Sequence, residues 1–239
     1  MKLYCENLVK IYNKKRVVNN VSISVSDSEV VGLLGPNGAG KSTTFNILMG
    51  FIRPDEGRIF LDDIDITNLS VYKRARFGIG YLAQEPTVFR ELSVEDNLIA
   101  ILERTESDRK KIMLKVDELL REFSIEHLRK RYAYTLSGGE KRRLEVARVM
   151  INSPKIVLLD EPFVGIDPIT VEELKKIIRY LKQKGIGILI SDHNVREMLS
   201  IVDRAYLIYQ GELLIEGDAA TLINDPKTRE VYLGSEFKI

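Results

Sequence analysis

The chain has 239 residues, of which 44% are hydrophobic and 30% charged, and its formal net charge is +1. This length supports one large domain with a sizeable core. The near-neutral charge excludes a basic field over the whole surface, so we do not expect nucleic acid as a partner. The single cysteine, Cys5, excludes an intramolecular disulfide and is expected to be a small buried hydrophobe in a reducing compartment.

The sequence offers no apolar stretch close to the ~18 residues that a membrane-spanning helix needs. Its first residues alternate apolar and polar types and lack the apolar run of a signal peptide. We therefore expect a cytoplasmic protein that reaches a membrane only by docking to another protein.

The N-terminal part of the chain is typical of short strands. Residues 2–12, 17–25 and 57–63 are rich in β-branched and aromatic types and are interrupted by Asn, Asp or Gly. Residues 29–51 predict an apolar strand, a glycine loop and a helix, and residues 78–84 a further short strand.

The rest of the chain changes from a helical pattern to an alternating one. Apolar residues recur at helical spacing from about residue 93 to 152, as at Ile112, Val116, Leu119, Leu120 and Phe123. Strands are then predicted at 155–161 and 187–193, helices at 167–185 and 194–202, and a hairpin at 204–218. These patterns predict one α/β domain over residues 1–239. Residues 1–85 and 153–239 would form its core, with a mostly antiparallel β portion, and about 86–152 an inserted helical subdomain.

The sequence "GPNGAGKST", from Gly35 to Thr43, matches the phosphate-binding loop pattern in full, after a strand and before a helix. In such a loop the glycines allow backbone N–H groups to surround a phosphate. The ammonium of Lys41 then reaches the β and γ oxygens, and the hydroxyl of Ser42 ligates Mg²⁺. This segment predicts a nucleoside triphosphate site.

Polar residues follow three other predicted strands. Asp160 and Glu161 end the buried strand "KIVLLDE", Gln84 ends "GIGYLAQ" and His193 ends "GILISDH". Ligands of an open parallel sheet bind beyond the carboxyl ends of its strands, so we expect these side chains beside the phosphate loop. There Asp160 would face Mg²⁺, and Glu161 would take a proton from an attacking water. The other histidine, His127, is expected to be a surface or packing residue.

The segment "YTLSGGEKRRLEVAR" contains a second glycine-lined helix start. Ser137 and Glu140 have the spacing of a capping box, and such a helix start favours an anion. We interpret the run Lys141, Arg142 and Arg143 that follows as a solvated helix face.

Together these motifs resemble the nucleotide-binding subunit of an ATP-binding cassette (ABC) transporter, over essentially the whole chain. "GPNGAGKST" is similar to Walker A, Gln84 to the Q-loop, "LSGGE" to the signature, "IVLLDE" to Walker B, "GIDP" to the D-loop and His193 to the switch histidine. The resemblance implies a P-loop NTPase fold, ATP hydrolysis, and ATP and Mg²⁺ as cofactors.

The resemblance also implies the site residues. ATP would be bound by Tyr12, stacked on adenine, and by Gly35, Pro36, Asn37, Gly38, Ala39, Gly40, Lys41, Ser42 and Thr43. Catalysis would involve Glu161, His193 and Gln84, and Mg²⁺ would be held by Ser42, Gln84 and Asp160. The D-loop residue would be Asp167.

In the family, two subunits pair head to tail when ATP binds. Ser137, Gly138, Gly139 and Glu140 would then serve the nucleotide of the partner subunit, and a two-fold homodimer would hold two composite sites. One departure is that Glu140 stands where the family most often has Gln. Capping accepts either residue, and the basic run that follows could offset the extra charge.

Several short segments resemble the ATPase subunit of the lipopolysaccharide export transporter: "YLAQEPTVFRELSVEDNL", "EPFVGIDPITV", "SDHNVREML" and "VYLGSEFKI". This resemblance implies integral membrane subunits as partners on the cytoplasmic face of the inner membrane. Phe89 and Arg90 would receive their coupling helix, although Phe89 could instead belong to the core of the helical insert. The C-terminal residues 231–239 would also be needed for function.

Three alternatives stay open at this point. The ATPase of a branched-chain amino acid importer is similar in length and loops, because membrane subunits choose the substrate. A soluble ABC protein of DNA repair or translation would normally carry two cassettes or a long coiled coil, which this sequence lacks. A non-hydrolysing scaffold would be expected to lose Glu161 or His193, and both are present.

Overall fold

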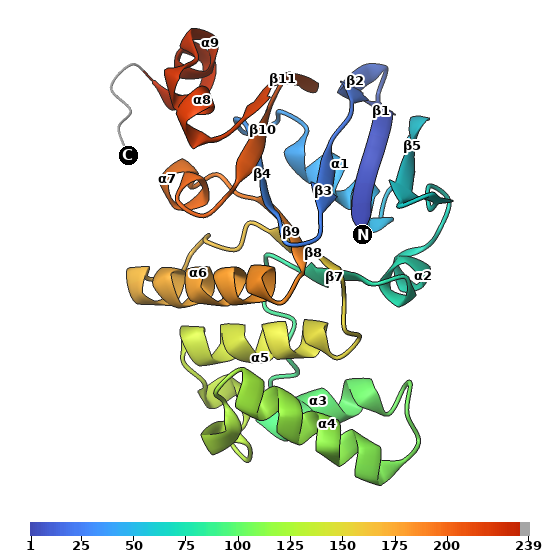
Figure 1. Cartoon of the computed structure of the whole chain (residues 1–239), viewed down its shortest axis with the longest axis vertical. Coiled ribbons are helices and arrows are strands. Elements are labelled where there is room, and N and C mark those ends of the chain that lie inside the picture. The colour runs from blue at the N-terminus through green and yellow to red at the C-terminus, as the bar shows by residue number, and fades with distance from the viewer. Residues whose placement is uncertain (235–239) are drawn as a thin grey trace.

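The computed structural model describes residues 1–234 and contains two sheets; most of the helices lie below the sheets or to the left in Figure 1, and N-terminal strands lie at the upper right edge. Of the C-terminal segment 231–239 that the sequence singled out, residues 235–239 lie outside the described part. Every helix in the described part is too short or too polar to cross a membrane.

The first sheet is antiparallel, with the strand order β2-β1-β5-β6 and with β3 paired to β1. Its strands are β1 (Lys2–Tyr12), β2 (Lys15–Val21), β3 (Ser24–Ser26), β5 (Glu56–Leu61) and β6 (Ile64–Asp65). The single strand predicted at 17–25 is therefore wrong: it is divided between β2 and β3. β1 pairs with β2 at its C-terminal end and with β3 at its N-terminal end. A left-handed Asn20 (φ 55°) lies just before the break.

The second sheet has the strand order β11-β10-β4-β9-β8-β7. Its strands are β4 (Val30–Leu34), β7 (Ile79–Leu82), β8 (Ile156–Asp160), β9 (Gly187–Ser191), β10 (Arg204–Tyr209) and β11 (Glu212–Gly217). All neighbouring strands are parallel except β10 and β11, which form the predicted hairpin. The carboxyl ends of β4, β9, β8 and β7 consequently meet at one edge of the sheet.

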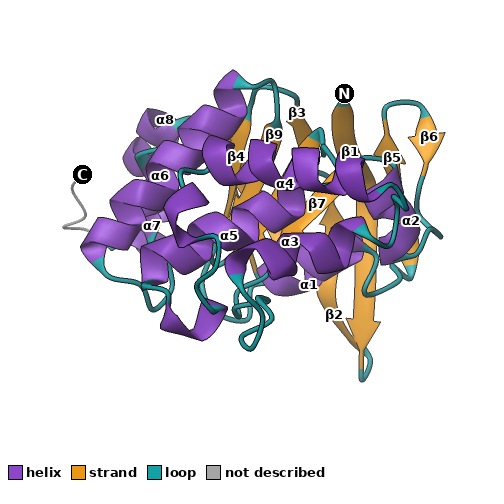
Figure 2. Ribbon diagram, turned by 90° about the horizontal axis from the view of Figure 1, so that it is seen from below, coloured by secondary structure: helices purple, strands orange, loops and turns teal. Residues whose placement is uncertain are grey.

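The helices cover these sheets, as Figure 2 shows from below. They are α1 (Lys41–Met49), α2 (Val71–Arg76), α3 (Val94–Leu102), α4 (Arg109–Glu122), α5 (Gly138–Met150), α6 (Pro168–Gln183), α7 (Val195–Leu199), α8 (Ala219–Asn224) and α9 (Pro226–Thr228). Short turns of 3₁₀-helix lie at Glu126–Leu128 and Ala133–Thr135, and a π-helical turn at Arg229–Leu233. The sequence missed α2, α8 and α9 because helices of three to six residues are too short to show a period.

Two hydrophobic clusters hold the elements together. Helix α1 lies between the sheets, where the fully buried Phe45 packs in one cluster with residues of both sheets. The other cluster runs from the parallel sheet through α6 and α5 to α3 and α4. It includes Ile112, Val116, Leu119, Leu120 and Phe123, as the sequence predicted.

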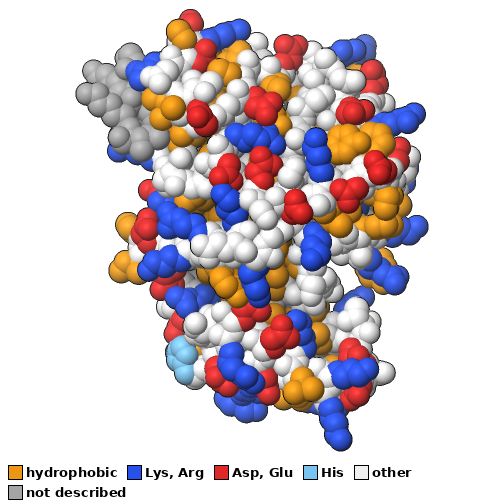
Figure 3. All heavy atoms as spheres, viewed as in Figure 1, with side chains coloured by type: hydrophobic (Ala, Val, Ile, Leu, Met, Phe, Trp, Pro, Cys, Tyr) orange, Lys and Arg blue, Asp and Glu red, His pale blue; other side chains and the backbone are white. Residues whose placement is uncertain are grey.

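Charged side chains of both signs are mixed over the face in Figure 3. The basic run that follows the signature segment is not the solvated face that we expected, because Arg142 is buried and bonds Glu145 at 2.8 Å. Arg143 forms an ion pair with Glu173 of α6 at 3.3 Å. Arg142 is enclosed and Arg143 is partly covered, because α5 contacts α6 on one side and α3 on another.

Candidate active site

The phosphate loop connects β4 to α1. Gly40 adopts a left-handed conformation (φ 105°) at the N-cap of α1, and no side chain caps that helix. Lys41 is 5% exposed, and its ammonium donates to the carbonyls of Gly35 at 2.6 Å and Pro36 at 3.1 Å. Burial lowers the pKa of Lys41, and the nearby charges of Glu161 and Asp192 act against that effect. A cation and a glycine-lined helix start thus share one loop, an arrangement suited to an anion.

Glu161 contacts two other residues that the sequence assigned to this edge. Its Oε2 atom accepts a hydrogen bond from Gln84 Nε2 at 3.1 Å and lies 3.7 Å from His193 Nδ1. The backbone of Glu161 is left-handed (φ 44°), and its N–H donates to the Ser191 carbonyl at 2.6 Å. A non-glycine residue in this conformation stores strain, which is frequent at functional sites.

Asp160 precedes Glu161 at the end of β8. One carboxylate oxygen accepts from the Tyr81 hydroxyl at 3.3 Å, while Oδ1 is buried with no hydrogen-bond partner. Burial, followed by the charge of Glu161, raises the pKa of Asp160. A buried carboxylate oxygen without a partner is costly and requires an explanation.

The sequence missed Asp192, which is fully buried beside His193. Its two carboxylate oxygens accept from the backbone N–H groups of Phe163 at 2.8 Å and Asn194 at 2.7 Å. Asp192 thereby ties the segment after Glu161 to the end of β9. An acid directly before a candidate histidine was the available sequence signal.

Two further buried polar atoms without a partner belong to elements of this site. The hydroxyls of Thr44 on α1 and Ser191 on β9 are buried and unbonded. Burial raises the pKa of the Tyr232 hydroxyl to about 12; the Gly35 backbone acts against that effect and the Asp192 charge adds to it. This edge of the sheet therefore has unused hydrogen-bonding capacity.

The signature segment has the predicted capping box. Ser137 Oγ accepts from the Glu140 N–H at 3.3 Å, and Glu140 Oε2 accepts from the Ser137 N–H at 2.8 Å. These bonds, the Ser137 backbone first, lower the pKa of Glu140. Glu140 also pairs with Arg131 at 3.7 Å. The charge of Glu140 is thus offset by Arg131 rather than by the basic run after it, which corrects our expectation.

The signature turn packs against the start of α6. A Cβ atom on Gly139 would lie 2.3 Å from a Glu173 carboxylate oxygen. Asp167 caps α6 by accepting bonds from the N–H groups of Ile169 and Thr170. Within residues 1–234, no hydrogen bond or ion pair joins the signature turn to the phosphate loop, so these two glycine-lined helix starts are not bonded to each other.

Tyr12 is 43% exposed at the end of β1. The Lys10 ammonium lies 5.5 Å from the centroid of its ring. The ring is thus available to a ligand and is no part of the core.

Phe89 and Arg90 lie exposed in the loop between β7 and α3, which excludes the core interpretation of Phe89. The Arg148 guanidinium of α5 lies 4.6 Å from the centroid of the Phe89 ring. The sequence missed Asn97, which is fully buried and bonds both the N–H (2.8 Å) and the carbonyl (3.0 Å) of Phe89. An amide at a buried position of α3 holds this loop in place.

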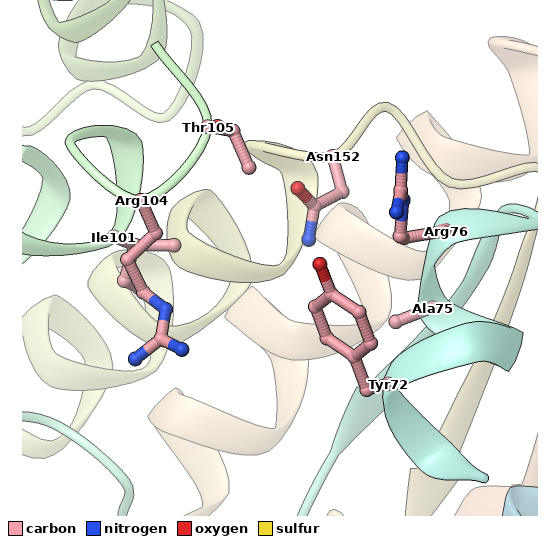
Figure 4. A pocket seen from close by; sticks show the side chains of 7 residues that line it. All are labelled: Tyr72, Ala75, Arg76, Ile101, Arg104, Thr105 and Asn152. Atoms are coloured by element: carbon pink, nitrogen blue, oxygen red, sulfur yellow. The ribbon is translucent and has the colours of Figure 1, made fainter. Parts of the chain in front are cut away.

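A pocket of about 450 Å³ opens between α2 and α3. Figure 4 shows Tyr72 rising from α2 with its hydroxyl towards Asn152, while Arg104 extends from the turn that follows α3. The pocket is lined by Tyr72, Ala75, Arg76, Ile101, Arg104, Thr105 and Asn152. A second pocket shares three of these residues and reaches Thr87 and Arg148, beside Phe89. We call the two together the α2–α3 pocket.

The chain matches the family described as ABC transporter over residues 18–164. A probable ABC transporter ATP-binding protein of Azorhizobium caulinodans is 52% identical over 97% of this chain and 83% of that protein. The lipopolysaccharide export system ATP-binding proteins LptB of Escherichia coli and Haemophilus influenzae are 49% and 48% identical, over 99% of both chains in each pair.

Solved structures agree with these relatives. A crystal structure of an ATP-binding cassette of an ABC transporter, in its ADP conformation, superposes with a TM-score of 0.88 and 31% identity. The match covers 98% of this chain and 100% of that chain. The P-loop α/β fold expected from the motifs is confirmed.

Proposed function

This chain belongs to the ABC transporter family of ATP-binding proteins, which are ATPases, and we propose that it powers lipopolysaccharide export from the inner membrane. The similarity to LptB over 99% of both chains carries this proposal. Contacts among the residues at one sheet edge support an ATPase mechanism there.

In this proposal residues 35–43 bind the phosphates of ATP. The N–H groups of the first turn of α1 have no capping side chain, so they and the helix dipole are available to the phosphates. Lys41 donates to two carbonyls of its own loop and would exchange these bonds for phosphate oxygens. Tyr12 would stack on the adenine.

Mg²⁺ would be held by Ser42, Gln84 and Asp160. The unpartnered Oδ1 atom of Asp160 fits this role, because a cation gives a buried carboxylate oxygen the partner it lacks. One carboxylate together with phosphate oxygens is a ligand set that Mg²⁺ commonly takes. When bound, the ion would neutralise charge that develops on the phosphates.

Glu161 would act as the general base. Its carboxylate takes a proton from water while the water oxygen forms a bond to the γ-phosphorus and the bond to the β–γ bridging oxygen breaks. Gln84 and His193 both lie against Glu161 Oε2 and would orient the carboxylate and the water.

The signature would act on the nucleotide of a partner subunit in an ATP-dependent homodimer. The absence of bonds between the signature turn and the phosphate loop, within residues 1–234, supports action between chains. Asp167, at the start of α6 beside the signature turn, would face the partner at the same interface. A two-fold pair then completes two sites with one chain type.

The α2–α3 pocket, with Phe89 and Arg90, would receive a helix of the membrane subunits on the cytoplasmic face of the inner membrane. Exposed aromatic and arginine side chains around a hollow are typical of interface hot spots. We further propose that residues 86–152 act as a helical subdomain that carries the signature and responds to this contact.

Two measurements test the proposal. Purified protein with Mg²⁺ and ATP should release phosphate, and the matched variant Glu161→Gln should lose roughly 10²–10⁴-fold in rate while it retains ATP and forms dimers in gel filtration. A variant that stays monomeric with ATP would contradict the composite site.

Affinity purification from membranes then tests the transport assignment. We expect the lipopolysaccharide export membrane subunits, whereas recovery of branched-chain amino acid permeases would overturn it. Phe89→Ala should keep the solution ATPase and lose coupling to these subunits, with the solvent-exposed Leu114→Ala of α4 as a control. A lowered solution ATPase would instead give Phe89 a packing role.

A further inference from the structure

Arg74 on α2 is a buried arginine without a carboxylate. Its side chain is among the largest that are fully enclosed, at 1% exposure, and it forms no ion pair in residues 1–234. The guanidinium instead donates to four carbonyls: Leu69 at 3.0 Å, Ile47 at 2.7 Å, Leu48 at 2.5 Å and Thr67 at 2.9 Å. Burying an unpaired charge is expensive, so this arrangement calls for a reason beyond packing.

Two of the four acceptors, the carbonyls of Ile47 and Leu48, belong to the last turn of α1. A cation at a helix C-terminus satisfies carbonyls that lack intrahelical partners and interacts favourably with the dipole. The same nine-residue helix begins at Lys41 and Ser42 of the phosphate loop. Arg74 therefore holds the far end of the helix whose near end carries the proposed phosphate site.

The end of α1 lies in close contact with Arg74 and with the segment before α2. Gly50 ends α1 in a left-handed conformation (φ 86°), and a Cβ atom there would lie 2.9 Å from Arg74 Nε and 3.0 Å from the Leu69 carbonyl. The close approach and the left-handed backbone both require glycine. A displacement of α2 would thus be transmitted to the end of α1.

The opposite face of α2 is exposed. Tyr72 and Arg76 flank Arg74 in sequence and line the α2–α3 pocket, with Tyr72 63% exposed (Figure 4). A six-residue helix thus presents Arg74 to the C-terminus of α1 and other side chains, Tyr72 and Arg76 among them, to the pocket.

We propose that Arg74 is a positioning residue that couples the α2–α3 pocket to the phosphate-loop helix. A partner seated in the pocket moves α2, Arg74 carries the movement to the carbonyls of Ile47 and Leu48, and α1 shifts the groups around the nucleotide. Coupling of binding energies is reciprocal, so ATP at the phosphate loop alters the surroundings of Tyr72. The inference rests on the proposed nucleotide site.

The absence of tryptophan from the sequence provides a direct test. In a Tyr72→Trp protein the only indole lies in the pocket, and its emission is followed during titration with ATP in EDTA, which prevents hydrolysis. Calorimetry measures the ATP affinity in parallel. We expect a saturable emission change with the calorimetric dissociation constant.

Adding Arg74→Met to the Tyr72→Trp protein should remove about half or more of the emission change, while calorimetry still shows ATP binding. Coupling networks of this kind change linkage by roughly 2- to 30-fold. Lys73→Met is the matched control, because Lys73 is an exposed cation on the same helix, and it should leave the response intact. A purely structural role for Arg74 would lower thermal stability and leave the emission change unaltered.

If Arg74→Met does not fold, Arg74→Lys decides, since lysine keeps the charge but cannot reach four carbonyls as the guanidinium does. An unchanged emission response in either folded variant would overturn the coupling role. Failure of the Tyr72→Trp protein to bind ATP at all would instead remove the proposed nucleotide site, and the inference with it.

Discussion

Helix α1 is preceded by a glycine and helix α5 begins with two, but of these two helices only α5 has side chains bonded to its first turn. Ser137 and Glu140 form a reciprocal cap on α5, whereas α1 starts at the left-handed Gly40 with no capping side chain. The surroundings differ in the same way. Buried atoms of Thr44, Asp160 and Ser191 near α1 lack partners, while the charge of Glu140 is satisfied by the Ser137 backbone and Arg131.

We infer from this difference that the start of α1, and not that of α5, can hold a ligand by itself. A terminus without a cap costs stability until a ligand supplies the missing partner. The capped terminus of α5 is complete and offers an anion a modest interaction of ~0.3–1 kcal/mol. The proposed second role of α5, to close a site already formed on another subunit, needs no more than that.

The largest expected effect comes from blocking the surface of the α5 terminus. Ser137→Arg should lower ATPase activity by at least roughly 10²-fold, the scale of lost transition-state contacts, since a long side chain would keep the partner's nucleotide away. Nucleotide binding by the monomer should be unchanged in calorimetry. Loss of monomer binding would show that α5 serves its own chain.

A second effect separates capping from ligand contact. Ser137→Ala removes the Oγ acceptor of the Glu140 N–H and should cost about 1 kcal/mol of stability, measured by denaturant unfolding. Gly40→Ala at the start of α1 cannot serve as the control for Ser137→Ala, because it would force a non-glycine residue to φ 105° and add backbone strain. Unaltered stability of Ser137→Ala would mean that the capping box contributes nothing.

The third prediction concerns pH at the α1 side of the comparison. The pKa of Asp160 is raised in the folded protein, so the folded state holds this proton more tightly than the unfolded state, and ionisation lowers stability as pH rises. Asp160→Asn without nucleotide should therefore be more stable than the parent at neutral pH. The difference should vanish as pH falls below the ordinary carboxyl range. Thermal unfolding at several pH values measures it, and a deficit at neutral pH would contradict the stated cause.

The smallest effect is expected at Glu140. Glu140→Gln restores the residue most usual in the family and keeps the cap geometry, so stability should change by no more than about 0.5 kcal/mol. Unfolding and steady-state ATPase assays on the same preparations check this. A large gain in activity would mean that the Glu140 charge does oppose phosphate despite Arg131.

Much of the candidate site could be predicted from local signals. Strands whose apolar runs are visible in the sequence lead directly to the candidate residues. These are the phosphate loop, the acids at the end of β8, Gln84 and His193. Parallel strands bring such residues to one edge, and the contacts of Glu161 with Gln84 and His193 confirm that three of them meet. Helix α2, with Tyr72, Arg74 and Arg76, was invisible because six residues are less than two helical turns.

Burial of charge could not be read from the chain. Arg142 and Arg143 stand in a basic run that predicts a solvated face, but Arg142 is enclosed with Glu145 and Arg143 pairs with Glu173. No pattern in the sequence shows that Asn97 and Asp192 are buried. Their roles appear only in the fold, which places backbone donors and acceptors around them. Each of these roles depends on elements distant in sequence.

The family, the strand-loop-helix order and the identity of the proposed reactive side chains could be predicted from the sequence, because contiguous residues with fixed local geometry specify them. Only the folded structure shows which polar groups are buried, which lack a partner, and which helices contact one another. Those properties arise from packing between segments far apart in the chain, and no local pattern specifies them.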